Sequence, residues 1–193
     1  MSFSCLEETV CRYQLPDDFT SIRLGNLWRA AGPSLHNVTV SIFSRTPMTV
    51  LSQQVVEERF SLVHNTSLRT IRFDGSSPSG MPLECGWMYF MLAQVVSPHV
   101  ESVIFAFRTI HHASFLMRDY THLIDSTLTR PPFAELQTVL FLLDTPFSDD
   151  DARLLRDQFP ELCSRRLLRI RGTRLLHSTL NPANGALSST SHV

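Results

Sequence analysis

A short apolar motif recurs along this chain. Each copy reads apolar-x-x-apolar-x-apolar and follows an apolar helical segment that ends at a proline or a polar break. The four clear copies begin at Leu35, Leu68, Val100 and Leu136. Their starts are separated by 33, 32 and 36 residues, and a degenerate fifth copy carries Leu168 and Ile170. A period of this length is typical of stacked supersecondary units, so the pattern predicts an array of helix–strand repeats.

A helix is predicted before each motif from apolar residues spaced three and four positions apart. The first helix has Leu27, Trp28 and Ala31 on one face, together with Leu24. It ends at Gly32, because glycine suits the position after a helix and the next residue is a proline. The other helices are expected over residues 56–63, 87–95, 120–128 and 149–159.

The ends of these helices carry recognisable signals. Ser148 precedes three aspartates, which is typical of a hydroxyl N-cap followed by acidic residues in the positive first turn. Prolines close four of the five predicted helices, at positions 33, 98, 131 and 160. The helices are therefore expected to be short and to stop before each strand.

The strands predict the fold class. Consecutive strands joined by helices must run parallel. The alternate apolar residues that should face the helices are Val38, Val40, Ile42, Ile71, Phe73, Val103, Phe105, Phe107, Val139, Phe141 and Leu143. We expect an α/β fold, an irregular leucine-rich-repeat-like solenoid of about five helix–strand units, with parallel strands on one face and helices on the other. Residues 139–143 are apolar on both faces, so something is expected to cover that strand's open side.

Three regions are expected along the chain. Residues 1–16 form an N-terminal capping segment, residues 17–177 the solenoid and residues 178–193 a disordered, serine-rich tail. In the capping segment, Leu6, Val10 and Tyr13 fit a short helix with one apolar face. That helix would be a remnant of an upstream repeat or would lie along the edge of the first strand. Residues 43–54 and 73–86 are expected to be loops, either solvated connections or partner contacts.

Composition excludes several classes of protein. The net charge of −1 and the pI of about 6.7 give no general attraction to nucleic acid or to anionic membranes. No apolar run is long enough to span a membrane, and the first twenty residues do not resemble a secretory signal, so a cytoplasmic or nuclear protein is expected. All 17 basic residues are arginine. Biased codon usage and avoidance of ubiquitin-acceptor lysines both explain that bias.

Several segments resemble the leucine-rich-repeat-like region of F-box-associated proteins of mushroom-forming fungi. The string Leu-Trp-Arg-Ala-Ala-Gly-Pro-Ser-Leu-His-Asn-Val at 27–38 is similar to their Leu-Trp and Gly-Pro-Ser-Leu element, and residues 65–71, 133–139 and 159–162 resemble later repeats. The likeness covers residues 17–174, without an evident F-box. It implies a repeat region that recognises protein substrates for a cullin-type ubiquitin ligase, with ligase components as partners.

Candidate chemistry is sparse. No dinucleotide-binding, phosphate-loop or nucleophile-elbow motif is present. The best cluster of potential metal ligands is His111, His112, Asp119, His122 and Asp125. Histidines adjacent in sequence do not easily converge on one ion, so these are interpreted as surface residues. No catalytic residue, metal site or cofactor is predicted.

An arginine-rich segment near the C-terminus has two interpretations. Its members are Arg153, Arg156, Arg165, Arg166, Arg169, Arg171 and Arg174. They could bind phosphate on a partner or a nucleic acid, or they could shield the open edge of the last strand. Nearby acidic residues and the lack of interleaved aromatic residues favour edge shielding, and nucleic acid is not expected as a partner.

These observations predict a non-catalytic protein–protein interaction module. The predicted contact residues lie on the strand face, out of phase with the core: Arg72, Asp74, Arg108, Asp144, Arg169 and Arg171. Two alternatives remain open: an α/β hydrolase or transferase with a doubly wound sheet, which would need a topological switch point, and a truncated relic without function. The sequence does not identify the partner.

Overall fold

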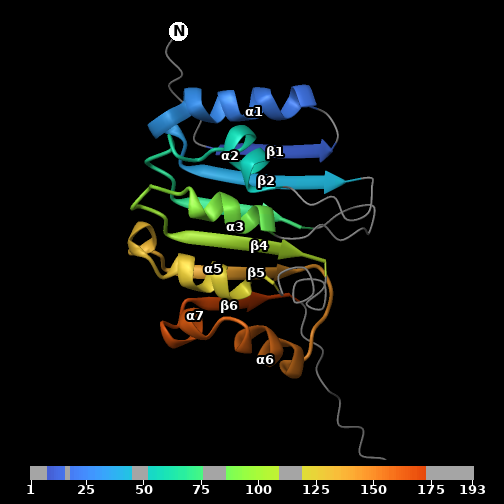
Figure 1. Ribbon diagram of the computed structural model, residues 1–193. Helices are drawn as coiled ribbons and strands as arrows, with labels where there is room; N and C mark the ends of the chain where they lie inside the picture. Colours follow the sequence, from blue (N-terminus) through green and yellow to red (C-terminus); the bar gives the residue numbers. More distant parts are fainter. Residues whose placement is uncertain (1–7, 16–17, 45–51, 76–85, 109–118, 173–193) are drawn as a thin grey trace, which may run out of the picture.

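The protein has an α/β fold built on one six-stranded sheet (Figure 1). The computed structural model describes residues 8–15, 18–44, 52–75, 86–108 and 119–172. The strands are β1 (Glu8–Leu15), β2 (Asn37–Ser44), β3 (Thr70–Asp74), β4 (Ser102–Phe107), β5 (Thr138–Leu143) and β6 (Leu168–Arg171). Every neighbouring pair is parallel, and the strands lie side by side in chain order.

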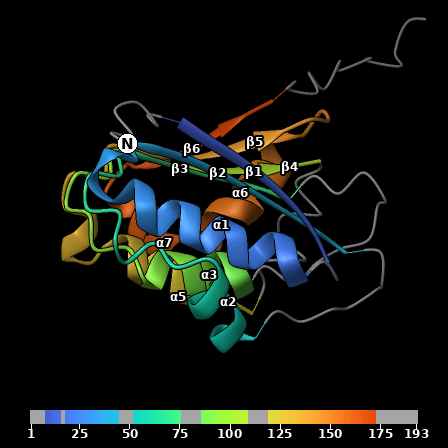
Figure 2. The same ribbon diagram turned by 90° about the horizontal axis from the view of Figure 1, so that it is seen from above.

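The helices lie on one face of this sheet (Figure 2). The α-helices are α1 (Asp18–Ala31), α2 (Gln53–Arg59), α3 (Gly86–Ala93), α5 (Thr121–Leu128), α6 (Asp149–Asp157) and α7 (Pro160–Ser164). Short 3₁₀ turns occupy Gly32–Ser34 and Pro131–Phe133. Each crossover connects a strand to the next strand on the same side of it in the sheet. Because all crossovers have the same hand, every connecting helix lies on the same face. The predicted parallel strands in chain order are confirmed within the described residues.

The core fills the space between the sheet and the helices. The inward residues of β3, β4 and β5 are buried as the alternation predicted, whereas the side chain of Ile42 lies outside the described residues. Phe73, Phe105 and Phe141 occupy the same register position on neighbouring strands. Their rings stack with centroid distances of 5.5 and 5.2 Å. This aromatic ladder carries the core across the unit boundaries, because each ring contacts its counterpart in the next unit.

The units are also joined by a backbone contact that repeats with the sequence motif. The carbonyl oxygen of His36 accepts hydrogen bonds from the N–H groups of Arg69 and Thr70, at 2.7 and 3.1 Å. The carbonyls of Arg69 and Glu101 make the same double contact with the following unit. Each acceptor directly follows the apolar residue that opens its motif copy. The sequence repeat therefore corresponds to a structural repeat.

Two predicted helix ends are confirmed and one is wrong. Helix α1 ends at Ala31, and Gly32 follows with φ of +49°, a left-handed conformation that side-chain-bearing residues rarely adopt. Ser148 caps α6: its hydroxyl accepts the N–H of Asp151 at 3.1 Å, and the Asp151 carboxylate accepts the N–H of Ser148 at 2.9 Å. Pro160, by contrast, begins α7 rather than closing α6. Proline lacks a backbone N–H group, and the first turn of a helix does not use that donor.

The N-terminal helix that we predicted is wrong. Residues Glu8–Leu15 form β1 and pair in parallel with β2, with Val10 opposite Thr39. The edge of β2 offers unpaired backbone groups, and a segment containing threonine, valine and tyrosine satisfies them better as a strand than as a helix. The sheet therefore has six strands, one more than the five predicted units would supply.

The apolar faces of two helices are narrower than predicted. Leu27 is 38% exposed and Val63 is 44% exposed, although both were expected among the core-facing residues. Val63 lies beyond α2, which ends at Arg59, and Leu27 lies beside the buried stripe of α1. The greater part of the predicted loops and the whole predicted tail, residues 45–51, 76–85 and 178–193, lie outside the described residues.

Candidate functional site

The outer face of the sheet carries the side chains that alternate with the core. Strand register aligns them in two rows. The first row contains Thr39, Arg72, Ile104, Leu140 and Arg169. The second row contains Ser41, Asp74, Ala106, Leu142 and Arg171. Both rows are thus apolar at the centre, on β4 and β5, and polar or charged on either side.

The apolar centre of this face is the feature that the sequence analysis recognised only in part. Ile104, Leu140 and Leu142 are half-buried and Ala106 is 4% exposed, while the described helices all lie on the opposite face. The sequence predicted two apolar faces for β5, but β4 also has them. The signal was present, since residues 103–107 are apolar without interruption.

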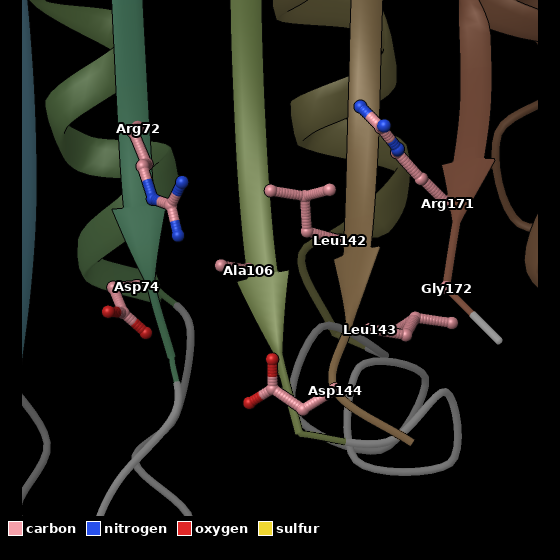
Figure 3. Close-up of a pocket in the computed structure, with 8 residues that line it drawn as sticks. All are labelled: Arg72, Asp74, Ala106, Leu142, Leu143, Asp144, Arg171 and Gly172. Carbon is pink, nitrogen blue, oxygen red and sulfur yellow. The ribbon is translucent and has the colours of Figure 1, made fainter. Parts of the chain in front are cut away.

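A cavity lies at the carboxyl end of this face. Its volume is about 330 Å³, and it spans the ends of β3, β4, β5 and β6 (Figure 3). The lining residues are Arg72, Asp74, Ala106, Leu142, Leu143, Asp144, Arg171 and Gly172. Parallel strands bring their carboxyl ends to the same edge of the sheet, which explains why residues from four strands meet here. The floor is apolar and the sides are charged.

The charged residues of the cavity differ in whether they have interaction partners within the protein. Figure 3 shows the side chains of Arg72 and Arg171 leaning toward one another across β4 and β5, with Asp74 and Asp144 at the strand ends. Neither arginine forms an ion pair or a side-chain hydrogen bond with any other residue that the structure describes. Both aspartates have interaction partners. Of these four charged groups, the two guanidinium groups are the ones without a partner among the described residues.

The structure brings four of the six predicted contact residues together. Arg72, Asp74, Asp144 and Arg171 all line the cavity. Arg169 lies on the same sheet face, on β6 in the row before Arg171, and is exposed.

Arg108 and Asp144 lie just past the ends of their strands rather than on the strand face. The carbonyl of Arg108 accepts the N–H of Thr145 at 3.0 Å, and the N–H of Asp144 donates to the carbonyl of Phe107 at 3.2 Å. The pairing of β4 and β5 thus continues one step beyond the strands. Arg108 is exposed but is not among the residues that line the cavity.

Asp125 has a structural position that the sequence analysis did not identify. Its carboxylate is buried and accepts the N–H groups of Glu161 and Leu162, at 2.8 and 2.9 Å, so it caps the start of α7 from α5. Burial raises the pKa of Asp125, although the two backbone donors act in the opposite direction. His111 and His112 lie outside the described residues, and no group of three or more potential metal ligands occurs among those described.

The arginine-rich segment is spread over several elements. Arg153 pairs with Asp150 on α6, whereas Arg165 and Arg166 follow α7. Arg169 and Arg171 lie on β6, which pairs only with β5 among the described strands, and Arg174 lies outside the described residues. Among the described members of this segment, Arg171 is the one that lines the cavity.

Wider comparisons give little direct guidance on function. None of the helices in the described part of the chain has the length and apolarity needed to cross a membrane. No protein-family model, no curated protein and no solved structure matches this chain.

Proposed function

We propose that this protein is a non-catalytic protein–protein interaction module, built as an irregular leucine-rich-repeat-like solenoid, whose partner binds the outer face of the sheet. The observation that carries the proposal is the composition of that face. Ile104, Leu140 and Leu142 form an apolar centre with arginines on both sides. Apolar cores with polar rims are typical of protein interfaces, and arginine is enriched in them.

Sheet topology favours this proposal over the enzyme alternative. Doubly wound α/β enzymes bind their substrates where the strand order reverses and helices change face. The described strands follow one another in chain order without such a reversal, and the helices share one face. A sheet face that no described helix covers, together with repeated units, is the arrangement that solenoid proteins use for docking.

A more specific role follows from the sequence resemblance to F-box-associated proteins. In that role the outer face would recognise a substrate for a cullin-type ubiquitin ligase in the cytoplasm or nucleus. The tagged chain, expressed in cells of its source organism, should then co-purify with a cullin and its adaptor. Co-purification of partners without any ligase component would separate this role from the general binding proposal.

Site-specific photo-crosslinking tests the general proposal. A photoreactive amino acid replaces Leu142 on the outer sheet face or, as a matched control, Leu154 on α6, which is 59% exposed on the helix side. Irradiation in cells of origin should yield discrete crosslinked species from position 142 and not from position 154. Equal labelling from both positions, or none from position 142, would contradict partner binding at the strand face.

A further inference from the structure

We propose that the cavity at the carboxyl ends of β3–β6 binds an extended acidic segment of a protein partner, in which an apolar residue lies between two carboxylates. This inference rests on the proposed function and names the chemistry of the partner. It follows from three features of the cavity: two available guanidinium groups, an apolar floor and the distance between the arginines.

The available charge in the cavity is positive. Arg72 and Arg171 have no ion-pair partner among the described residues, whereas Asp74 and Asp144 each have an interaction partner. A guanidinium group presents a planar set of donors that matches a carboxylate, and such charge-assisted hydrogen bonds are stronger than neutral ones. Arg169, exposed in the neighbouring row, adds to the positive potential on the β6 side. An acidic ligand satisfies these groups.

The spacing of the arginines fits an extended peptide. Arg72 on β3 and Arg171 on β6 are separated by three strand spacings, about 14 Å at about 4.8 Å each, and by two residues along the strands, about 7 Å, so their backbones lie about 16 Å apart. Their side chains lean toward one another (Figure 3), which brings the guanidinium groups closer together than the backbones. In an extended chain, residues i and i+4 point to the same side and lie about 13 Å apart. A peptide that crosses the strands can therefore place one carboxylate near each arginine.

The same geometry assigns a place to the residue between the carboxylates. Position i+2 of such a peptide also faces the sheet and falls midway between the arginines. The apolar residues there are Ala106 and Leu142, opposite one another on β4 and β5, and Ile104 and Leu140 in the row before them. The cavity volume of about 330 Å³ accommodates an apolar side chain above them. A leucine, isoleucine or phenylalanine at this position would cover apolar surface that no described helix covers.

Nucleic acid fits this cavity poorly. Proteins that bind single strands stack bases on aromatic side chains, and none of the described residues that line the cavity is aromatic. Asp74 and Asp144 would also lie close to any phosphate chain that ran along the strand ends. A short peptide with two separated carboxylates avoids this repulsion, because its charges reach only the arginine sides of the cavity.

Peptide selection tests this assignment. The 193-residue chain is immobilised and screened against a phage-displayed library of short random peptides. Enriched peptides are then measured on the wild-type protein and on Arg72→Gln, Arg171→Gln and Arg165→Gln. Glutamine keeps a polar side chain of similar length but removes the charge. Arg165 is exposed and does not line the cavity, so its variant is the matched control.

The expected result is enrichment of peptides with an apolar residue between two acidic ones. Each cavity variant should weaken their binding by about tenfold or more, the control should not, and added salt should weaken it further. Enriched peptides without acidic residues, acidic peptides that bind all four proteins equally, or no enrichment at all would overturn the assignment. Crosslinking from position 142 would then still support partner binding, so the two proposals fail separately.

Discussion

At the scale of single residues, Trp28 shows most directly how the first unit is held together. Its side chain is 0% exposed, and its ring lies 6.2 Å from that of Phe60. Its carbonyl oxygen also accepts a hydrogen bond from the side-chain amide of Asn65, at 2.8 Å. Trp28 therefore links α1 to the following unit by packing and by a buried hydrogen bond.

Replacement of this side chain should be costly. We expect Trp28→Ala to lower the free energy of unfolding by about 3–5 kcal/mol, because it removes a large buried ring and leaves a cavity. Leu27→Ala is the control, since Leu27 is the adjacent residue of α1 and is 38% exposed. Its effect should stay within about 0.5 kcal/mol. Urea unfolding measures both, and similar losses in the two variants would contradict the observed division between the buried and exposed sides of α1.

Asp125 predicts a pH-dependent contribution to stability. Because burial raises its pKa in the folded protein, its stabilising contribution is fully present below the unfolded-state pKa and declines as pH rises through the folded-state value. Asp125→Asn does not titrate, and its amide can accept only one of the two N–H groups. We expect the free energy of unfolding of the variant to be lower than that of the wild type by about 1–3 kcal/mol. This difference in free energy should become smaller as pH increases.

The measurement for Asp125 is urea unfolding at several pH values across the acidic range. Asp157→Asn on α6 serves as the control, because that carboxyl group is exposed and its replacement leaves α7 capped. A gap that widens with pH would show that the carboxylate is stabilised by its two donors more than it is destabilised by burial.

At the scale of elements, the sequence predicted those parts whose pattern is local. Strands β2 and β3 alternate with the period of the sheet, and β4 and β5 are short apolar runs. Gly32 and Ser148 mark helix ends by their own chemistry. Strand β1 was missed because the stabilisation of its pairing with β2 comes from the edge of that strand, and the strand propensity of residues 8–15 alone did not outweigh their helical spacing. Pro160 was misread because a proline is compatible both with the position after a helix and with the first turn of the next one, and here it begins α7.

The candidate site was predictable from the sequence only as far as local alternation determines it. Alternation placed Arg72 and Arg171 on the outer face, and the structure agrees. What alternation cannot give is the cross-strand register, which sets Arg171 opposite Leu142 and leaves Arg108 outside the cavity. Register depends on how the strands pair over the whole sheet, so the cavity emerges only from the folded structure.

Strand β1 predicts the behaviour of a truncated protein. Removal of residues 1–15 would leave the edge of β2 without its partner, and an unpaired strand edge invites pairing with another chain. We expect this variant to self-associate and to melt at a lower temperature, as measured by light scattering after size-exclusion chromatography and by thermal unfolding. Removal of residues 1–7 alone retains β1 and is the control. A monomeric 1–15 deletion with an unchanged melting temperature would show that β1 is dispensable.

At the scale of the whole molecule, buried polar side chains join successive units. The Asn65 amide donates to the carbonyls of Trp28 and Gly32 in the preceding unit, and the Ser97 hydroxyl donates to the carbonyl of Leu68 at 2.9 Å. Asp125 makes the corresponding link forward to α7. Each of these hydrogen bonds satisfies a backbone group at a boundary between units. Without it, that backbone group would be buried without a partner. Stability is thus expected to depend on contacts between neighbours.

That dependence predicts a gradient of local stability across the sheet. In the described structure β2, β3, β4 and β5 are paired on both sides, whereas β1 and β6 are each paired on one side. Amide hydrogen exchange followed by mass spectrometry should show slower exchange in the four interior strands than in β1 and β6. The expected difference is about tenfold or more, which corresponds to about 1.4 kcal/mol of opening free energy. Phe105→Ala should accelerate exchange in β3 and β5 more than in β1. Within the aromatic ladder, the Phe105 ring contacts Phe73 on β3 and Phe141 on β5. Equal protection in all six strands, or an equal response of β1, would instead indicate one cooperative core and contradict the solenoid proposal.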